Sequence, residues 1–264
     1  MINKTRINPL LLAFVLLFVA SKSYAQQHIP QSKAEKGIIN YLKQMKHWQK
    51  QKKEYSSDSV YAVNKRLIQL MSDIGYEGYT LSADFKNLKA AGMQIHTSDD
   101  QMCRTFCWEV ISYGSSHYYN YMITYYQSAT RSMSFTNKDG TSLTDIYTVH
   151  TYDSNTIYLM HEENRYDIKN RMSRYVAHVL KNGYLTITTF FYNNADSQTF
   201  AGYTYNLSSF SAKEQKIPQV RLSENKQEFF VPIINNGGIF SGNELVYRFD
   251  GRKFVYDTYT KKKN

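Results

Sequence analysis

The sequence predicts an α+β fold in which an N-terminal helical hairpin packs on a large antiparallel β meander. Apolar residues recur at helical spacing between residues 32 and 73, and they alternate at the two-residue spacing of strands after Gly92. Turn-forming pairs such as Asn182-Gly183 and Asp250-Gly251 separate the alternating runs. The meander can be propeller-like or a sandwich, and its short, locally connected strands favour the propeller-like arrangement.

Two amphipathic helices are expected near the N-terminus. In residues 32–55, Ile38, Leu42 and Met45 fall on one face, and lysines fill the opposite face. A polar break at residues 56–58 precedes the second helix. The short connection between the two predicts an αα-hairpin.

The second helix runs over residues 59–73, and Gly75 is a suitable C-terminal stop. A third, short helix is expected over residues 83–91, where Gly92 ends it. We therefore expect a helical hairpin region over residues 26–78 and an antiparallel β domain over residues 79–264.

Short alternating runs predict the strands of the β domain, and residues 128–143 and 208–226 are expected to be polar loops. The expected strands are 93–97, 102–111, 118–127, 144–151, 156–163, 174–181, 184–192, 201–207, 227–234, 238–241, 244–249 and 252–257. The chain also has 24 tyrosines, which suit half-exposed strands because the ring packs while the hydroxyl stays hydrated.

Two glycine turns predict two-residue type I′ hairpins. Asn182-Gly183 joins two alternating runs, and Asp250-Gly251 does the same further along the chain. A two-residue loop at Asp250-Gly251 would place Tyr247 opposite Phe254. The segment 235–238, Asn-Asn-Gly-Gly, marks a further turn.

The first 25 residues read as a cleavable signal peptide. Lys4 and Arg6 precede an apolar run over residues 10–20, and Ser23-Tyr24-Ala25 is a small-x-small cleavage pattern. The alternative is a membrane anchor, but eleven apolar residues fall short of the about 20 that a spanning helix needs. No cysteine stands at the cleavage site for a lipid anchor. The protein is thus expected to be secreted or periplasmic, with no transmembrane segment after cleavage.

Basic residues are concentrated close to the predicted mature N-terminus. Residues 33–53 contain seven lysines and one acid, Glu35. Without residues 1–25 the chain has 29 basic and 22 acidic residues, a formal charge of +7. The cluster can be a solvated helix face, or it can bind anionic lipid headgroups or polysaccharide. Export argues against nucleic acid as a partner.

Cys103 and Cys107 are expected to be free thiols. An exported protein favours disulfides, but residues 102–111 alternate as a strand does. Four residues of strand span about 13 Å, whereas disulfide-bonded Cα atoms lie within about 7 Å.

Two stretches resemble a family of uncharacterised secreted β-rich proteins of Bacteroidetes-type bacteria. The first is residues 95–109, Ile-His-Thr-Ser-Asp-Asp-Gln-Met-Cys-Arg-Thr-Phe-Cys-Trp-Glu, with the strand at 119–127. The second is residues 228–234, Glu-Phe-Phe-Val-Pro-Ile-Ile, with the hairpin at 245–256. The chain departs from the pattern at residues 113–117, where family members have a Gly-Gly-Thr segment. The resemblance implies an exported β-rich fold and supplies no catalytic residue.

Glu109, Ser115 and His117 are the candidate ligand-binding residues. Trp108 is expected in the core, whereas Glu109 points to the other face beside the turn that contains Ser115 and His117. A hydroxyl, an imidazole and a carboxylate are the components of a nucleophilic site. Ser115 and Ser116 can equally just build the turn, and no Gly-x-Ser-x-Gly motif is present. We therefore assign no catalytic residue.

Acidic residues give no clear pair for glycoside hydrolysis, and we expect them to be exposed turn residues. The acids considered are Asp153, Glu162, Glu163, Asp167 and Asp196.

The histidines predict no metal site. His150 and His161 flank a turn, and only a two-residue loop would place them on one face. His178 is expected to be a satisfied core residue. No glycine-rich phosphate loop is present, and no cofactor is expected.

The main hypothesis is an exported, non-enzymatic binding or interaction protein that contacts a glycan or a cell-envelope component. High aromatic content, positive charge and the missing catalytic motif favour it. The alternatives are a secreted hydrolase acting on polysaccharide or peptide, and a structural subunit of an envelope assembly.

Overall fold

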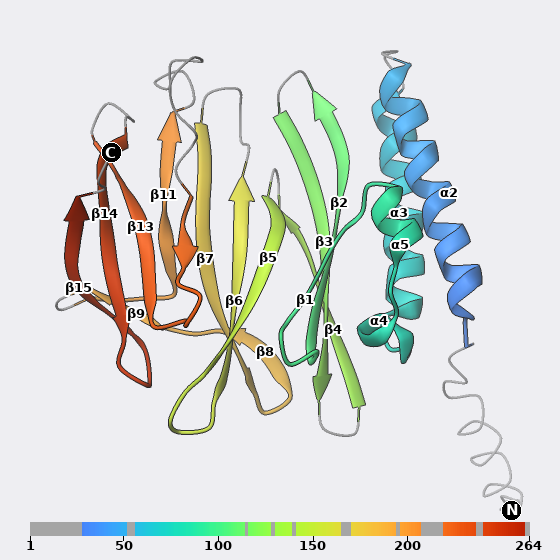
Figure 1. Cartoon of the computed structure of the whole chain (residues 1–264). Coiled ribbons are helices and arrows are strands. Elements are labelled where there is room, and N and C mark those ends of the chain that lie inside the picture. Colours follow the sequence, from blue (N-terminus) through green and yellow to red (C-terminus); the bar gives the residue numbers. More distant parts are fainter. Residues whose placement is uncertain are drawn as a thin grey trace, which may run out of the picture.

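The computed structural model describes residues 28–51, 56–113, 116–127, 130–138, 141–164, 170–193, 196–206, 219–235 and 240–261. A layer of helices, two antiparallel sheets and one mixed sheet lie side by side in chain order (Figure 1). Three separate apolar cores fill the spaces between the four layers. The fold is mainly β-sheet with a helical N-terminal part, as an α+β class predicts. The predicted signal peptide, residues 1–25, lies outside the described residues.

The helical layer contains α2 (Gln31–Lys50), α3 (Ser56–Ile74), α4 (Tyr79–Ser82) and α5 (Lys86–Ala90). The predicted stripe of α2 is confirmed, because Ile38, Leu42 and Met45 are all buried. The stripe of α3 is buried in the same core. No helix of the described residues is long and apolar enough to cross a membrane.

The first sheet has the order β1 (Gln94–Thr97), β2 (Cys103–Tyr113), β3 (Ser116–Gln127) and β4 (Thr130–Lys138). The side chains of β2 and β3 alternate between two apolar surroundings, as the two-residue period predicts. Phe106, Trp108 and Val110 of β2 pack against the helices, whereas Cys103 and Cys107 pack against the second sheet.

Trp108 is the largest side chain in the helix–sheet core and is 1% exposed. Its indole Nε1–H donates to Oδ1 of Asn64 on α3 at 2.9 Å. The hydrogen bond satisfies a buried polar group on each side and links the hairpin to the sheet.

The second sheet is formed by β5 (Thr141–His150), β6 (Thr156–Asn164), β7 (Asn170–Lys181), β8 (Tyr184–Ile187) and β11 (Phe200–Asn206). β8 and β11 pair with different stretches of β7, and β6 pairs with β7 along its length. Gly202 of β11 lies opposite Arg174, and a Cβ at Gly202 would fall 2.2 Å from the Arg174 Cβ. A side chain at that position would therefore push the two strands apart.

The third sheet is formed by β9 (Phe191–Asn193), β10 (Asp196–Gln198), β12 (Arg221–Leu222), β13 (Glu228–Ile234), β14 (Phe240–Phe249) and β15 (Phe254–Lys261). Its order is β10-β9-β15-β14-β13-β12, and β9 pairs with β15 in parallel. A set of touching aromatic rings fills the space between the second and third sheets. The set comprises Tyr175, Phe190, Phe191, Phe229, Tyr247 and Phe254.

The chain crosses from the second sheet to the third after β8 and returns at β11. The backbone of Ala177 accepts from Thr188 N–H and donates to the carbonyl of Thr199, both at 2.9 Å. The segment that passes through the third sheet is therefore hydrogen-bonded, at both of its ends, to one residue of β7.

The three sheets are also tied together by polar contacts along one edge. Asp99, in the turn between β1 and β2, accepts from Lys226 of the third sheet, and its N–H donates to Thr148 Oγ1 of β5 at 3.2 Å. Lys226 also donates to the Thr148 carbonyl at 3.1 Å. The neighbouring Asp100 accepts from the Tyr158 hydroxyl at 3.0 Å.

Charged side chains cover apolar residues on the outer face of the third sheet. The Arg221 guanidinium lies 3.7 Å from the ring centre of Phe230 and pairs with Glu244 at 2.8 Å. Lys253 lies 3.7 Å above the ring of Tyr192 in the same way. The long side chains shield apolar surface while their charges stay hydrated.

The predicted polar loop over residues 128–143 is wrong. β4 pairs with β3 from Thr130 to Lys138, and β5 already begins at Thr141. Pairing with β3 decides the structure here, because β propensity is weak relative to cross-strand contacts. In the second predicted loop, residues 208–218 lie outside the described residues, and Arg221–Leu222 form β12.

Several element boundaries differ from the prediction. The predicted helix 83–91 is shorter, because α5 spans Lys86–Ala90, and α4 was not predicted. The first helix ends at Lys50. The predicted strand 184–192 is divided between β8 and β9, because the chain changes sheet there. The predicted strands 238–241 and 244–249 belong to one strand, β14.

The Asn182-Gly183 turn is confirmed. Both residues have positive φ, +50° and +81°, and the flanking residues pair across a two-residue loop. Of the predicted turn at residues 235–238, all but Asn235 lie outside the described residues.

The predicted register at Asp250-Gly251 is wrong. Phe249 pairs with Phe254, so the loop has four residues and Tyr247 lies opposite Tyr256. The Asp250 carboxylate causes this longer turn, because Oδ1 accepts the N–H groups of Arg252 and Lys253 at 2.8 and 2.9 Å.

Both cysteines are free and fully buried, as predicted. Burial raises the pKa of the Cys107 thiol to about 12 and that of Cys103 well above its ordinary range. The thiolate is the reactive form.

We therefore expect iodoacetamide at pH 8 to leave both thiols unmodified in the folded protein and to alkylate both in urea, with mass spectrometry as the measurement. Native alkylation, or a Cys103–Cys107 disulfide, would contradict this assignment.

Candidate functional site

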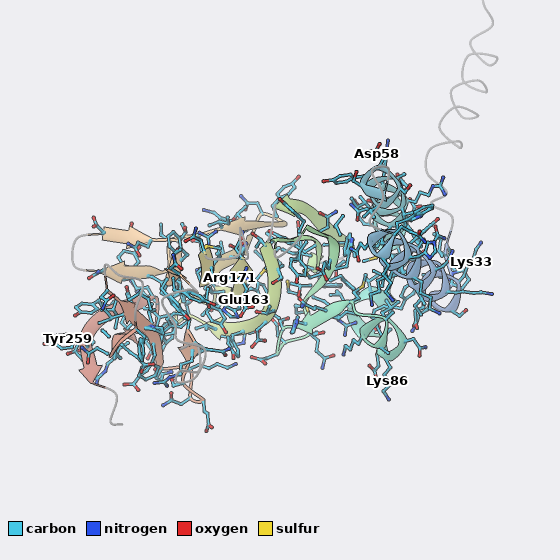
Figure 2. All side chains as sticks on the ribbon, turned by 90° about the horizontal axis from the view of Figure 1, so that it is seen from above. Lys33, Asp58, Lys86, Glu163, Arg171 and Tyr259 are labelled. Carbon is cyan, nitrogen blue, oxygen red and sulfur yellow. The ribbon has the colours of Figure 1, made fainter. Side chains whose placement is uncertain are left out.

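The outer face of α2 is a basic surface formed by the lysines of a single helix. Ala34, Ile38, Leu42 and Met45 turn inward, so the lysines on the other positions of the helix are left in solvent. Lys33 extends away from the sheets at the helical end of the molecule, opposite Tyr259 (Figure 2). Two grooves flank this helix.

The first groove lies on the α5 side of α2 and has a volume of about 870 Å³. Its lining residues are Gln31, Ser32, Glu35, Lys36, Ile39, Asn40, Lys43 and Asn87. Glu35 is its acid, and that carboxylate accepts from Gln31 at 2.7 Å and from Asn87 at 3.4 Å. The remaining lining is basic or neutral and polar, apart from Ile39.

The second groove lies between α2 and α3 and has a volume of about 550 Å³. Its lining residues are Ile29, Lys33, Lys36, Gly37, Asn40, Tyr41, Arg66, Gln69, Leu70 and Asp73. Gly37 permits the close approach of the helices, because a Cβ there would lie 2.8 Å from Leu70 Cδ2. Asp73 accepts from Gln69 at 2.8 Å.

The basic side chains of the grooves are exposed and not neutralised by neighbouring acids. Among the described residues, the ion pairs lie elsewhere, and Lys33, Lys36, Lys43 and Arg66 take part in none of them. These charges are thus available to an anionic ligand. Sequence reasoning found the lysines of α2 but missed Arg66. The signal that could have found it is a glycine inside a helical stripe, which indicates close packing of a second helix.

Of the predicted Glu109–Ser115–His117 site, the structure describes Glu109 and the backbone of His117. Glu109 lies opposite Tyr119, and His117 lies opposite Ser112 nearer the end of the hairpin. Ser115 and the side chain of His117 lie outside the described residues. The set therefore stays a sequence-based prediction.

His150 and His161 are not neighbours. Five residues connect β5 to β6, so His150 pairs with Thr156, whereas His161 lies opposite Asp145 far along the strands. No group of three metal-ligating side chains occurs in the described part of the chain. His178 is half-buried, and its Nδ1 contacts the Val176 carbonyl at 3.2 Å.

His161 contacts two hydroxyls, a contact that sequence reasoning missed. Nδ1 lies 2.7 Å from Thr144 Oγ1, and Nε2 lies 2.8 Å from Ser173 Oγ. The ring stacks on Tyr175 at 4.5 Å between centres. A nucleophilic serine needs an accessible hydroxyl and an acid on the other imidazole nitrogen. Here Ser173 and His161 are each 6% exposed and the second nitrogen faces a threonine, so the arrangement is structural.

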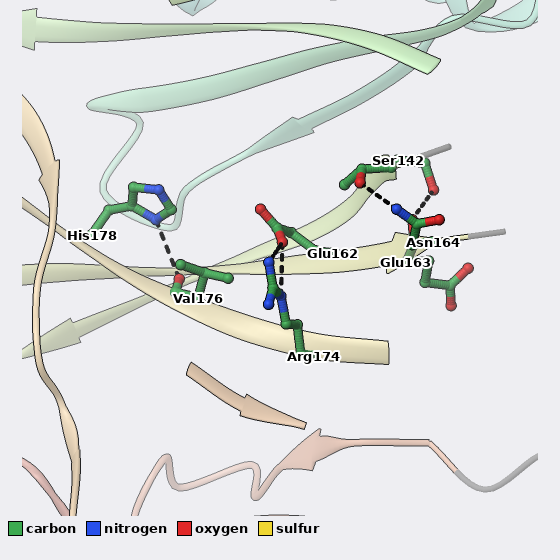
Figure 3. A network of polar contacts seen from close by, with 8 residues as sticks. Ser142, Glu162, Glu163, Asn164, Arg174, Val176 and His178 are labelled. Atoms are coloured by element: carbon green, nitrogen blue, oxygen red, sulfur yellow. Dashed lines mark hydrogen bonds and ion pairs between the residues drawn. The ribbon is translucent and has the colours of Figure 1, made fainter. Parts of the chain in front are cut away.

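The expectation that all the candidate acids are exposed turn residues is wrong for Glu162 and Glu163, which both lie in β6. Glu163 is half-buried, and Glu162 is buried. This carboxylate is 2% exposed and accepts from Nε and Nη2 of Arg174 at 2.9 and 2.7 Å (Figure 3). Pairing opposes the desolvation cost of the two charges. Asp153 lies in a turn and accepts from Thr151 and Asn155, and Asp196 is exposed in β10.

Asp167 lies outside the described residues. Each of the two grooves along α2 contains one carboxylate, Glu35 or Asp73, and these grooves remain the candidate site.

Comparisons with protein families, with curated proteins and with solved structures found no match. The resemblance to secreted β-rich proteins therefore stays a prediction.

Breaking the buried pair should be costly. We expect Arg174→Met to destabilise the fold by about 3–5 kcal/mol, because it removes the cation that donates two hydrogen bonds to the buried Glu162 carboxylate. Arg248→Met is the control, since Arg248 is exposed and pairs with Glu228 and Asp257 at the surface. Its loss should cost about 1 kcal/mol or less. Urea unfolding measures both, and equal losses would refute the distinction.

Stability should fall on acidification because of His161. Burial lowers the pKa of the His161 imidazole, against smaller opposing effects of Glu163, Asp145 and Glu162, with His96 acting in the same direction as burial. The unfolded chain, with an ordinary pKa of about 6.5, therefore binds a proton that the folded chain does not. The free energy of unfolding should decline below about pH 6.5, by at most about 1.4 kcal/mol per pH unit for this group.

His161→Gln should reduce that slope, measured by urea unfolding between pH 8 and pH 5. The pKa of His96 is also lowered by burial, so His96→Gln is measured alongside. An unchanged slope in His161→Gln would show that His161 does not titrate in this way.

Proposed function

We propose that the mature protein is an exported, non-enzymatic binding protein whose helical layer contacts an anionic glycan or another anionic component of the cell envelope. The observation that carries this proposal is the pair of grooves that flank α2 and share its unpaired basic side chains. Grooves with a few placed polar groups are the usual form of a ligand site.

The grooves rest on a rigid base, which supports a binding role. The inward faces of α2 and α3 share one core with the first sheet, and the hydrogen bond between Asn64 and Trp108 crosses that core. Gln49 of α2 also donates to the Val110 carbonyl of β2 at 2.8 Å. Ligand binding therefore needs only lysine side chains to become ordered, which lowers its entropic cost.

The charge of the surface supports an anionic partner. The groove lining contains Lys33, Lys36, Lys43 and Arg66 against two acids, Glu35 and Asp73. Both acids already accept hydrogen bonds from neighbouring amide side chains. Such a surface attracts anions over several ångströms, in a manner that salt weakens.

We further propose that the three sheets are consecutive units of an incomplete, propeller-like ring rather than a two-layer sandwich. The contacts of Asp99 and Lys226 support this arrangement, because they bring β5, the β1–β2 turn and the segment between β12 and β13 together at one edge. The first sheet is a meander, and the second and third sheets contain the meanders β5-β6-β7 and β12-β13-β14-β15.

A glycan array that contains neutral and acidic glycans tests the binding function. We expect the mature protein to bind acidic glycans, and the double variant Lys36→Glu/Lys43→Glu to bind at least about tenfold more weakly, a difference of about 1.4 kcal/mol. The control is Lys50→Glu, which reverses one charge on α2 rather than two and lines neither groove.

The control should keep the wild-type signal, and circular dichroism should show that all variants are folded. Absence of any binding by the wild-type protein to the array and to isolated envelope fractions would remove the proposed function.

A further inference from the structure

Lys36 and Asn40 line both grooves, so they form a ridge on α2 between them. The two residues are four positions apart and therefore lie one above the other on the helix surface. A ligand that binds Lys36 is in reach of both grooves. One extended molecule can thus occupy both sides of the ridge.

The basic groups are spread along the helix rather than gathered at one point. Lys33, Lys36 and Lys43 are separated by three and seven residues, which correspond to about 4.5 and about 10.5 Å along the helix axis. Arg66 of α3 lies across the second groove. A small anion can meet one or two of these charges, whereas a linear polymer with repeated acidic groups can meet all four.

Neutral hydrogen-bonding groups lie between the charges. Ser32, Asn40 and Asn87 line the first groove, and Tyr41 lines the second. Hydroxyl and amide side chains match the hydroxyl groups of a sugar ring, and ammonium groups match its carboxylates. The mixture therefore fits an acidic polysaccharide better than a polymer of phosphate alone.

The same surface is poorly suited to a membrane. Interfacial helices insert an apolar face into the lipid, but the apolar stripe of α2 is buried in the core. Of the described residues of α2, Trp48 is the one large hydrophobic side chain that is exposed, and it lies beyond both grooves.

We propose that the ridge of α2 binds a linear acidic polysaccharide that runs along the helix and engages both grooves through Lys36. This inference rests on the proposed binding function and specifies its ligand. Because each added contact is intramolecular once the first has formed, affinity should rise steeply with the length of the polymer.

Oligogalacturonates serve as the probe, as monomer, dimer, tetramer and octamer, with isothermal titration calorimetry of the mature protein at low salt. We expect the octamer to bind at least about tenfold more tightly than the dimer. A rise from 20 to 300 mM NaCl should weaken octamer binding strongly.

Single variants locate the ligand. Lys36→Glu should weaken octamer binding more than Lys33→Glu or Lys43→Glu, because Lys36 serves both grooves and each of the others serves one. Lys50→Glu, the matched control, should bind within about twofold of wild type when the variants are compared at about 150 mM NaCl, since exposed charges beyond about 10 Å are largely screened at that salt concentration.

Three results would overturn the inference. They are equal affinity for dimer and octamer, equal effects of Lys36→Glu and Lys50→Glu, and binding to phosphatidylglycerol vesicles without binding to the octamer. Each of these leaves the wild-type protein bound to some anionic ligand, and so differs from a failure of the proposed function, in which the glycan array and the envelope fractions show no binding.

Discussion

Burial of the first and second sheets on both faces is the constraint on which the rest of the structure depends. β2 directs Trp108 toward the helices and Cys107 toward the second sheet, and both side chains are almost inaccessible to solvent. A sheet with two apolar faces needs a cover on each side. The helical hairpin provides one cover for the first sheet, and the third sheet provides one for the second.

The outer surfaces at the two ends of this stack of layers are covered by different kinds of side chain. At one end the amphipathic helices turn their apolar stripes inward and leave a basic outer surface with two grooves. At the other end long charged side chains lie over aromatic rings, as Arg221 does over Phe230. At the sheet end the surface charges are paired, whereas at the helical end they are unpaired. For this reason the helical end is the more suitable place for an anionic ligand.

Sequence periodicity predicted the helical stripes, the inward tryptophan, the free thiols and the Asn182-Gly183 hairpin, because each depends on local spacing. It missed β4, in which Met133 and Phe135 are the two apolar residues of a largely polar run that pairs with β3. It also misjudged the register at Asp250, where a side-chain hydrogen bond lengthens the turn. Of the candidate site, the lysines of α2 were visible in the sequence, but Arg66 joins them only when α3 packs beside Gly37.

In the proposed function, the helical layer is the binding surface and the sheets are its support. The most direct measurement is a titration of the isotopically labelled mature protein with octagalacturonate, followed by amide chemical shifts in NMR spectra. The account predicts shift changes confined to α2, the facing side of α3 and the region of Asn87. Changes centred on the sheets, with α2 unaffected, would contradict it.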